Sequence, residues 1–141
     1  MSIRSLPLIV FAFVLYNVVV LLGGSTGPDD ILRQEVFHLP SFRGSAQVWS
    51  FNWGDLILLV TMLLLFAEIL KATYTSTASL LDHGLSMVVF IACLIEFLLV
   101  DAAFTSVFFL IMVATLIDVV AGYTIGIRVA RRDIGFGAME H

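Results

Sequence analysis

Residues 103–127 read AFTSVFFLIMVATLIDVVAGYTIGI, and this stretch decides the fold class. It holds one charged residue, Asp118, and as a helix it is long enough to cross a hydrocarbon core of about 30 Å, which takes about 17–25 residues. Three other apolar stretches precede it in the chain. The sequence therefore predicts an all-α integral membrane protein, a single domain over residues 1–141, whose four transmembrane helices form an antiparallel bundle. The predicted helices cover residues 6–23, 54–72, 84–100 and 103–127.

The composition excludes several classes of protein. The chain is 60% hydrophobic and 13% charged, with a mean hydropathy of +1.07, whereas a soluble domain is about 45–50% apolar and about 25% charged. A soluble globular fold and a disordered chain are both excluded on this ground. Seven Lys and Arg against 11 Asp and Glu give a net charge of −4, which argues against nucleic acid as a partner.

No cofactor or metal ion is expected, and no enzymatic activity is indicated. A single cysteine, Cys93, allows neither an internal disulfide nor a CxxC site. It is expected to be a packing residue. His38, His83 and His141 all lie outside the predicted helices, so no pair of them can hold a haem between helices. His83 follows an acid at a predicted helix start, where it is expected to neighbour the cap. No spacing suggests a catalytic set, and no glycine-rich phosphate loop is present.

Basic residues indicate the orientation of the predicted helices. Those that fall on one side of a four-helix topology are Arg4, Lys71, Arg128, Arg131 and Arg132. On the other side, Arg33 and Arg43 are diluted by acids in the loop 24–53. Since cytoplasmic loops carry an excess of Lys and Arg, both termini are predicted to be cytoplasmic and the loop of about 30 residues extracytoplasmic. The tail, 128–141, is expected to be loosely ordered.

The loop 24–53 contains two patterns. Pro28 and the acids after it are typical of a first helical turn, and Ile31, Leu32, Val36 and Phe37 predict a short amphipathic helix that Pro40 ends. Three aromatic residues then alternate with polar ones: Trp49, Phe51 and Trp53. Aromatic residues just outside a span indicate the interfacial belt of a membrane protein. Stacking on a ligand is the alternative.

Ionisable residues within the predicted helices are the candidate functional residues, because a central charge costs about 2.5–3.5 kcal/mol on insertion scales. Glu68 precedes Lys71 by three residues, so the two can form an ion pair on one helix face. Glu96 has no basic neighbour in the sequence, and Tyr16 and Asn17 lie at a similar depth on the first helix. These two are candidates to hydrogen-bond Glu96, and a titrating carboxyl linked to transport is the alternative.

Asp118 belongs to a stripe at four-residue spacing: Ala114, Asp118, Gly122 and Gly126. The two glycines form a GxxxG pattern that lets helices approach closely. Asp118 should therefore face a neighbouring helix. By depth, Glu68 and Lys71 are expected to lie near it, which would place two acids and one lysine in a cluster near the cytoplasmic face.

Two hypotheses of function follow. The first is a non-enzymatic, oligomerising or accessory subunit of a membrane complex, whose partners are the lipid bilayer, itself or other membrane proteins. The alternative is a small proton- or ion-coupled transporter or channel, built as a homo-oligomer, that uses the buried carboxylates. The size and composition are typical of a small protein of the bacterial inner (plasma) membrane.

Overall fold

The structure is a computed structural model that describes residues 6–44, 46–73 and 79–137. It is mostly helical, with one small sheet. In chain order its elements are α1 (Val10–Leu22), α2 (Pro28–Leu32), β1 (Glu35–Pro40), β2 (Val48–Asn52), α3 (Trp53–Thr73), α4 (Ser79–Leu99), the 3₁₀ turn η2 (Asp101–Ala103) and α5 (Ser106–Gly137).

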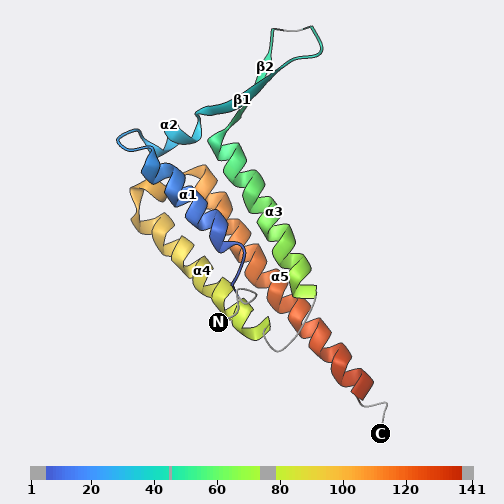
Figure 1. The fold of residues 1–141 in the computed structure, drawn as a ribbon. Coiled ribbons are helices and arrows are strands. Elements are labelled where there is room, and N and C mark those ends of the chain that lie inside the picture. The colour runs from blue at the N-terminus through green and yellow to red at the C-terminus, as the bar shows by residue number, and fades with distance from the viewer. Residues whose placement is uncertain (1–5, 45, 74–78, 138–141) are drawn as a thin grey trace.

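The four long helices pack side by side as a bundle (Figure 1). Helix α5 packs along both α3 and α4, and α1 contacts all three of the other long helices. Helix α2 and the two strands lie at one end of the bundle, which we call the hairpin end (Figure 1). At the opposite end α3 and α5 finish and α4 begins, and we call this the tail end.

Two of the helices are long and apolar enough to cross a membrane. They are Trp53–Thr73, with a mean hydropathy of 2.2, and Ser106–Arg132, with 2.1. The apolar parts of α1 and α4 are shorter, at Val10–Leu22 and His83–Leu99. Length and composition therefore identify α3 and α5 as candidate membrane spans.

The core lies where α1 meets the other three helices. Tyr16 of α1 packs edge-on against Phe108 of α5, with ring centroids 4.8 Å apart. Both side chains are almost fully buried. Other members of this core are Ile9, Ala12, Val20, Ile57, Cys93, Ile111 and Ala114. Cys93 is thus a buried packing residue in the structure.

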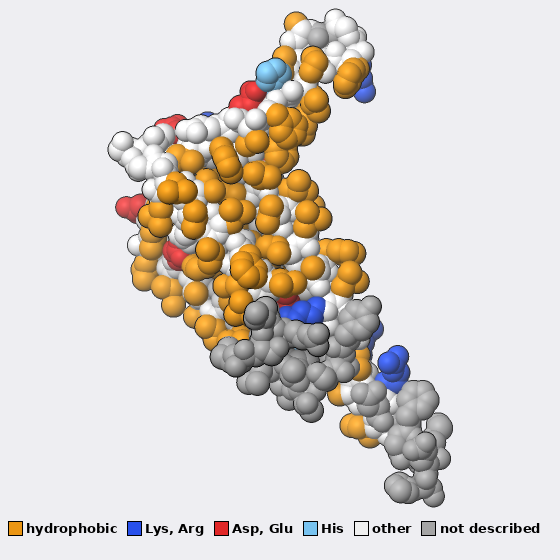
Figure 2. Space-filling view, in the orientation of Figure 1, with side chains coloured by type: hydrophobic (Ala, Val, Ile, Leu, Met, Phe, Trp, Pro, Cys, Tyr) orange, Lys and Arg blue, Asp and Glu red, His pale blue; other side chains and the backbone are white. Residues whose placement is uncertain are grey.

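The face of the bundle shown in Figure 2 is also largely apolar. Only 17% of the most apolar window of α3 is buried within the protein, although its mean hydropathy is 2.2. The large hydrophobic side chains exposed on α3 include Leu59, Met62, Leu63, Phe66 and Leu70. A soluble helix would instead present polar side chains on its outward face.

A two-stranded antiparallel hairpin replaces part of the predicted loop, so the fold is not entirely α-helical. The predicted amphipathic helix is correct only for Pro28–Leu32, which includes Ile31 and Leu32. Val36 and Phe37 lie in β1 instead. The alternation at Trp49–Asn52 is the period of a strand, and Gly44, with φ of +73°, provides a left-handed residue in the connection.

Two helix limits also differ from the prediction. Helix α1 begins at Val10, and residues 7–9 form a turn before it, in which Pro7 O accepts the Val10 N–H. Helix α5 continues to Gly137, so the described part of the tail is helical and not loosely ordered. Residues 128–134 contain neither proline nor glycine, so nothing in this part of the tail ends the helix.

Candidate functional site

The clearest polar site lies at the tail end, where Glu68 is buried with 4% of its surface exposed. Its Oε1 atom accepts a hydrogen bond from Lys71 Nζ at 3.1 Å, as the three-residue spacing predicts. Its Oε2 atom accepts the Leu8 N–H at 2.7 Å, and Lys71 Nζ also donates to Leu6 O at 3.1 Å. The pair therefore holds the segment before α1 against α3, a role that the sequence did not indicate.

Asp118 enters the same region from α5. Its side chain is 3% exposed, and its charge acts on that of Glu68. Two acids and one lysine thus lie near one another at the tail end, as their depth in the predicted helices indicated. Such a group can hold or exchange a proton, because the repulsion between two carboxylates is relieved when one binds a proton.

His83 also belongs to this end of the core, contrary to its predicted position beside a helix cap. Its side chain is 6% exposed and packs on α5 over both glycines of the GxxxG pattern. A Cβ atom added at Gly122 would lie 2.7 Å from His83 Cε1, and one at Gly126 would lie 3.4 Å from Nε2. The ring also packs on Tyr123, at 5.6 Å between centroids. Helix α4 begins at Ser79, so His83 lies within it and not at its start.

The imidazole of His83 is incompletely hydrogen-bonded. Among the residues that the structure describes, Nε2 has no hydrogen-bond partner although it is buried. The GxxxG face is occupied by this ring from the same chain, and the two glycines serve packing between α4 and α5. No sequence signal connects His83 to Gly122, since their contact depends on how far α4 is shifted along α5.

Tyr16 does not bond to Glu96 as the sequence suggested. Its hydroxyl donates to Ala102 O at 2.7 Å and shares a second hydrogen bond of 2.7 Å with Thr105 Oγ1. Thr105 precedes α5, and its Oγ1 accepts the Phe108 N–H at 3.2 Å, as an N-cap residue does. Tyr16 therefore joins α1 to the start of α5, and its hydroxyl is bonded there and not to Glu96.

Glu96 and Asn17 lie at the edge where α4 meets α1. Asn17 approaches the Glu96 carboxyl, as predicted, and its amide also donates to Phe13 O in its own helix at 3.1 Å. Both side chains are only partly buried. This edge thus places a carboxyl and an amide on the outer surface of the bundle, among apolar neighbours such as Ile95, which is 52% exposed.

The three predicted belt residues separate in the structure. Trp49 and Phe51 lie on one face of the hairpin, while Trp53 is the first residue of α3. His38 is an exposed hairpin residue, and His141 lies outside the described residues. Within residues 6–44, 46–73 and 79–137, no three His, Cys, Asp or Glu side chains gather as a metal site would require.

Comparisons of this chain with protein-family models, with curated proteins and with solved structures find no match.

Proposed function

We propose that the chain is an integral membrane protein of four spans, α1, α3, α4 and α5, with both termini in the cytoplasm. Its role is that of a non-enzymatic subunit that binds another membrane protein, or another copy of itself, through the edge between α1 and α4. The bacterial inner membrane is the proposed location.

The apolar outer surface supports the membrane assignment. A monomeric soluble protein rarely exposes large continuous apolar patches, whereas exposed hydrophobic side chains extend along α3 here. The basic residues Lys71, Arg128, Arg131 and Arg132 are at the tail end, and Arg33 and Arg43 are at the hairpin end with Asp29, Asp30 and Glu35. Because cytoplasmic segments of membrane proteins carry an excess of Lys and Arg, this distribution supports a cytoplasmic location for the tail end.

The observation that carries the proposed binding role is the partly exposed carboxyl of Glu96. Glu96 lies three residues before Leu99, the last residue of α4. A charged side chain facing lipid costs about 2.5–3.5 kcal/mol at the centre of a span on insertion scales, and less toward the end of a span. Asn17 offers one amide to this carboxyl, and the rest of the surrounding surface is apolar. A helix from a partner protein with a hydrogen-bond donor would cover the carboxyl and remove the cost.

The packing of the glycines supports the same edge as the interface. Because His83 occupies Gly122 and Gly126 from within the chain, those glycines are not available to a second copy. The edge between α1 and α4 combines polar groups with exposed apolar side chains, which is the composition of helix interfaces inside membranes.

Crosslinking in cells tests this proposal. A photoreactive amino acid at Ile95, beside Glu96, should capture one defined protein, and the capture should be lost in Glu96→Leu but kept in Glu96→Gln, which can still hydrogen-bond. Phe66 of α3, 62% exposed, is the matched control position and should capture only lipid. Equal capture in Glu96→Leu and wild type would contradict the proposed role of Glu96.

Transport of protons is the second candidate, and the buried group of Glu68, Asp118 and His83 favours it. This group lies at the tail end only, while the hairpin half of the core is filled by Tyr16 and Phe108. A path through one copy would be closed there, so transport would need an interface between copies. Asp118→Asn and Glu96→Gln should abolish pH-driven flux in liposomes if this candidate is correct, and unchanged flux would eliminate it.

A further inference from the structure

The hairpin of β1 and β2 has two chemically different faces. Phe37 pairs with Phe51, and Leu39 pairs with Trp49, so these four side chains share one face. The rings form a cluster, with centroids 4.8 Å apart for Phe37 and Phe51, 5.8 Å for Trp49 and Phe51, and 6.1 Å for Phe37 and Trp49. We call this set of four the aromatic face.

The opposite face carries polar groups near the base of the hairpin and the apolar pair of Pro40 and Val48 farther out. His38 pairs with Ser50 across the strands. His38 Nδ1 lies 2.6 Å from Glu35 Oε1, and Ser50 Oγ donates to Glu35 Oε2 at 2.9 Å. An irregularity in the register between Glu35 and Phe37 brings Glu35 to the side of His38. The two faces therefore differ, because three aromatic rings lie on one and a hydrogen-bonded polar group lies on the other.

The aromatic face is largely uncovered by the described residues of the chain. Trp49 is 56% exposed, and Phe37 and Leu39 are 46% and 44% exposed. A lone two-stranded hairpin is only marginally stable in water, and an apolar face open to water adds nothing to that stability. A layer that covers this face would stabilise it.

The hairpin is held in a fixed direction at the end of the bundle. No linker separates β2 from α3, because Asn52 is followed at once by Trp53. Trp53 N–H donates to Gln34 O at 3.1 Å, and Asn52 and Asp55 exchange hydrogen bonds of 3.1 and 2.9 Å between side chain and main chain. These contacts fix the base of both strands to the first turn of α3.

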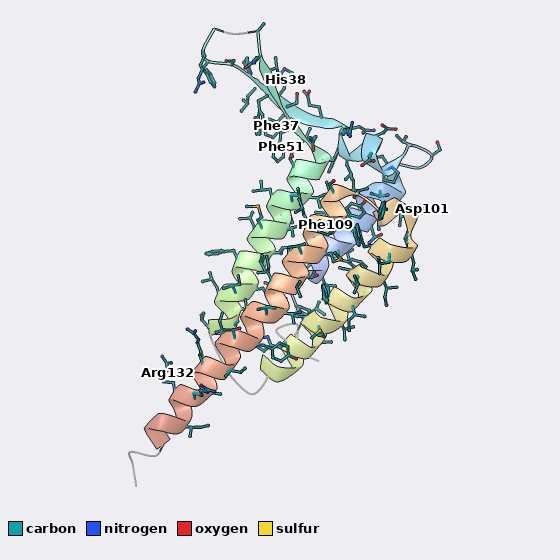
Figure 3. The ribbon with its side chains drawn as sticks, turned by 180° about the vertical axis from the view of Figure 1, so that it is seen from behind. Phe37, His38, Phe51, Asp101, Phe109 and Arg132 are labelled. Atoms are coloured by element: carbon teal, nitrogen blue, oxygen red, sulfur yellow. The ribbon has the colours of Figure 1, made fainter. Side chains whose placement is uncertain are left out.

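The direction of the hairpin is crosswise to the helices. In Figure 1 the strands extend away from the top of α3, across the line of α3 and α5. Hydrophobic side chains line the edge of the hairpin that faces back toward the helices, and acidic and histidine side chains lie along the other edge (Figure 2). Figure 3 likewise shows Phe37 and Phe51 near the start of α3 and His38 farther from it. If α3 crosses a membrane, the hairpin thus lies along its surface with the aromatic face toward the lipid.

We propose that the aromatic face is a docking surface for the outer leaflet of the bilayer, into whose interfacial zone it inserts. This inference rests on the membrane topology proposed above, but not on the role of Glu96. Trp side chains favour the interfacial zone, and Trp, Phe and Leu are the usual residues on the membrane-facing side of interfacial segments. In Figure 2 the hydrophobic edge of the hairpin continues onto the bundle. Residues 35–52 contain one acid, Glu35, and one fully charged base, Arg43. Arg43 lies near the tip, where it can reach lipid phosphates.

Tryptophan fluorescence in phosphatidylcholine vesicles tests this surface. The chain has two tryptophans, so Trp53→Phe leaves Trp49 as the only reporter. Vesicles made with lipids brominated near the headgroup end of their chains should quench its emission strongly, and its maximum should be blue-shifted. The matched control is Ser50→Trp in a Trp49→Phe, Trp53→Phe background. This reporter on the polar face should keep its emission with brominated lipid and lose it with acrylamide.

Two results would overturn the proposal. Trp49 emission that is red-shifted, quenched by acrylamide and unaffected by brominated lipid would place the aromatic face in water. Blue-shifted emission that is insensitive to brominated lipid would show that protein covers the face instead of lipid.

A third reporter separates this proposal from the topology on which it rests. Leu63→Trp, in the background without other tryptophans, lies on the exposed apolar side of α3. If brominated lipid quenches this reporter but not Trp49, the helix is in the membrane and only the hairpin proposal fails. If neither is quenched, the proposed topology fails too.

Discussion

The two ends of the bundle are held together by different interactions. At the hairpin end, Tyr16 and Phe108 fill the core, and the hydrogen bonds that join α1 to α5 are between uncharged groups. At the tail end, the buried side chains include the ionisable groups of Glu68, Asp118 and His83. The hairpin end therefore depends on packing and neutral hydrogen bonds, while the tail end depends on balanced charge and on one close approach between helices.

The two ends should therefore differ in their sensitivity to substitution. A buried ion pair adds little net stability relative to an apolar pair, but removing one partner alone is strongly destabilising. Single changes at the tail end should thus have larger effects than single changes at the hairpin end, and paired changes should cancel.

The largest effect is expected from Lys71→Met, which leaves the carboxyl of Glu68 buried without its cation. We expect a loss of about 3 kcal/mol in the free energy of unfolding, near the lower limit for broken buried pairs because Lys71 is partly exposed. Denaturant unfolding in detergent micelles, followed by circular dichroism, measures it.

The double variant Glu68→Gln, Lys71→Met is the control for charge. Glutamine keeps an acceptor for the Leu8 N–H, so most of the lost stability should return. A double variant as unstable as Lys71→Met would show that the lysine contributes through packing, and would contradict the contrast between the two ends.

The second-largest loss of stability is expected from Gly122→Ala, because the added methyl group would overlap the ring of His83. Overpacking of this kind costs about 1–3 kcal/mol, against a gain of up to about 1 kcal/mol from the better helix propensity of alanine. Gly126→Ala, where the nearest ring atom is 3.4 Å away, is the matched control and should be neutral or stabilising. The melting temperatures of both variants in micelles measure the difference. Equal melting temperatures would mean that His83 moves aside freely.

Much of the fold could be predicted from local sequence. Helix α3 runs over Trp53–Thr73 against a predicted 54–72, because a long apolar run with Lys71 close behind it indicates a helix and the region of its end. The contact of Glu68 with Lys71 follows from three-residue spacing alone. Both features depend on residues close together in the chain.

Features that depend on contacts between distant segments were missed. Strand β1, the partner of β2, is not predicted, for two reasons. Ile31, Leu32, Val36 and Phe37 fit helical spacing, and the irregularity near Glu35 interrupts the alternation expected of a strand. Similar depth in the predicted helices indicates a hydrogen bond between Tyr16 and Glu96, but depth alone does not determine on which side of α1 the phenol lies. The burial of His83 likewise depends on how far α4 is shifted along α5, which local sequence does not give.

At the hairpin end, Tyr16→Phe should have a smaller effect than Gly122→Ala or Lys71→Met. It removes the hydroxyl that joins Ala102 O and Thr105 Oγ1 but keeps the ring against Phe108. A lost buried hydrogen bond costs about 1 kcal/mol. Tyr123→Phe, at a 39% exposed tyrosine, is the matched control and should leave the unfolding midpoint unchanged. A loss for Tyr16→Phe as large as that for Lys71→Met would remove the distinction between the two ends.

The smallest effect concerns the polar face of the hairpin, outside the bundle. Hydrogen bonds from His38, and then from Ser50, lower the pKa of Glu35 below its ordinary value of 4.5. Because the pKa is depressed in the folded hairpin, the stabilisation is present above pH 4.5 and is lost as the pH falls through the lower folded value. A carbon-13 NMR titration of the Glu35 carboxyl in micelles should give a midpoint below 4.5. Ser50→Ala should raise that midpoint, and His38→Ala should raise it further. Ser41→Ala, near the tip, is the control and should leave it unchanged. An unperturbed midpoint in the wild type would show that Glu35 does not hold the two strands together, so that the hairpin would depend on its aromatic face alone.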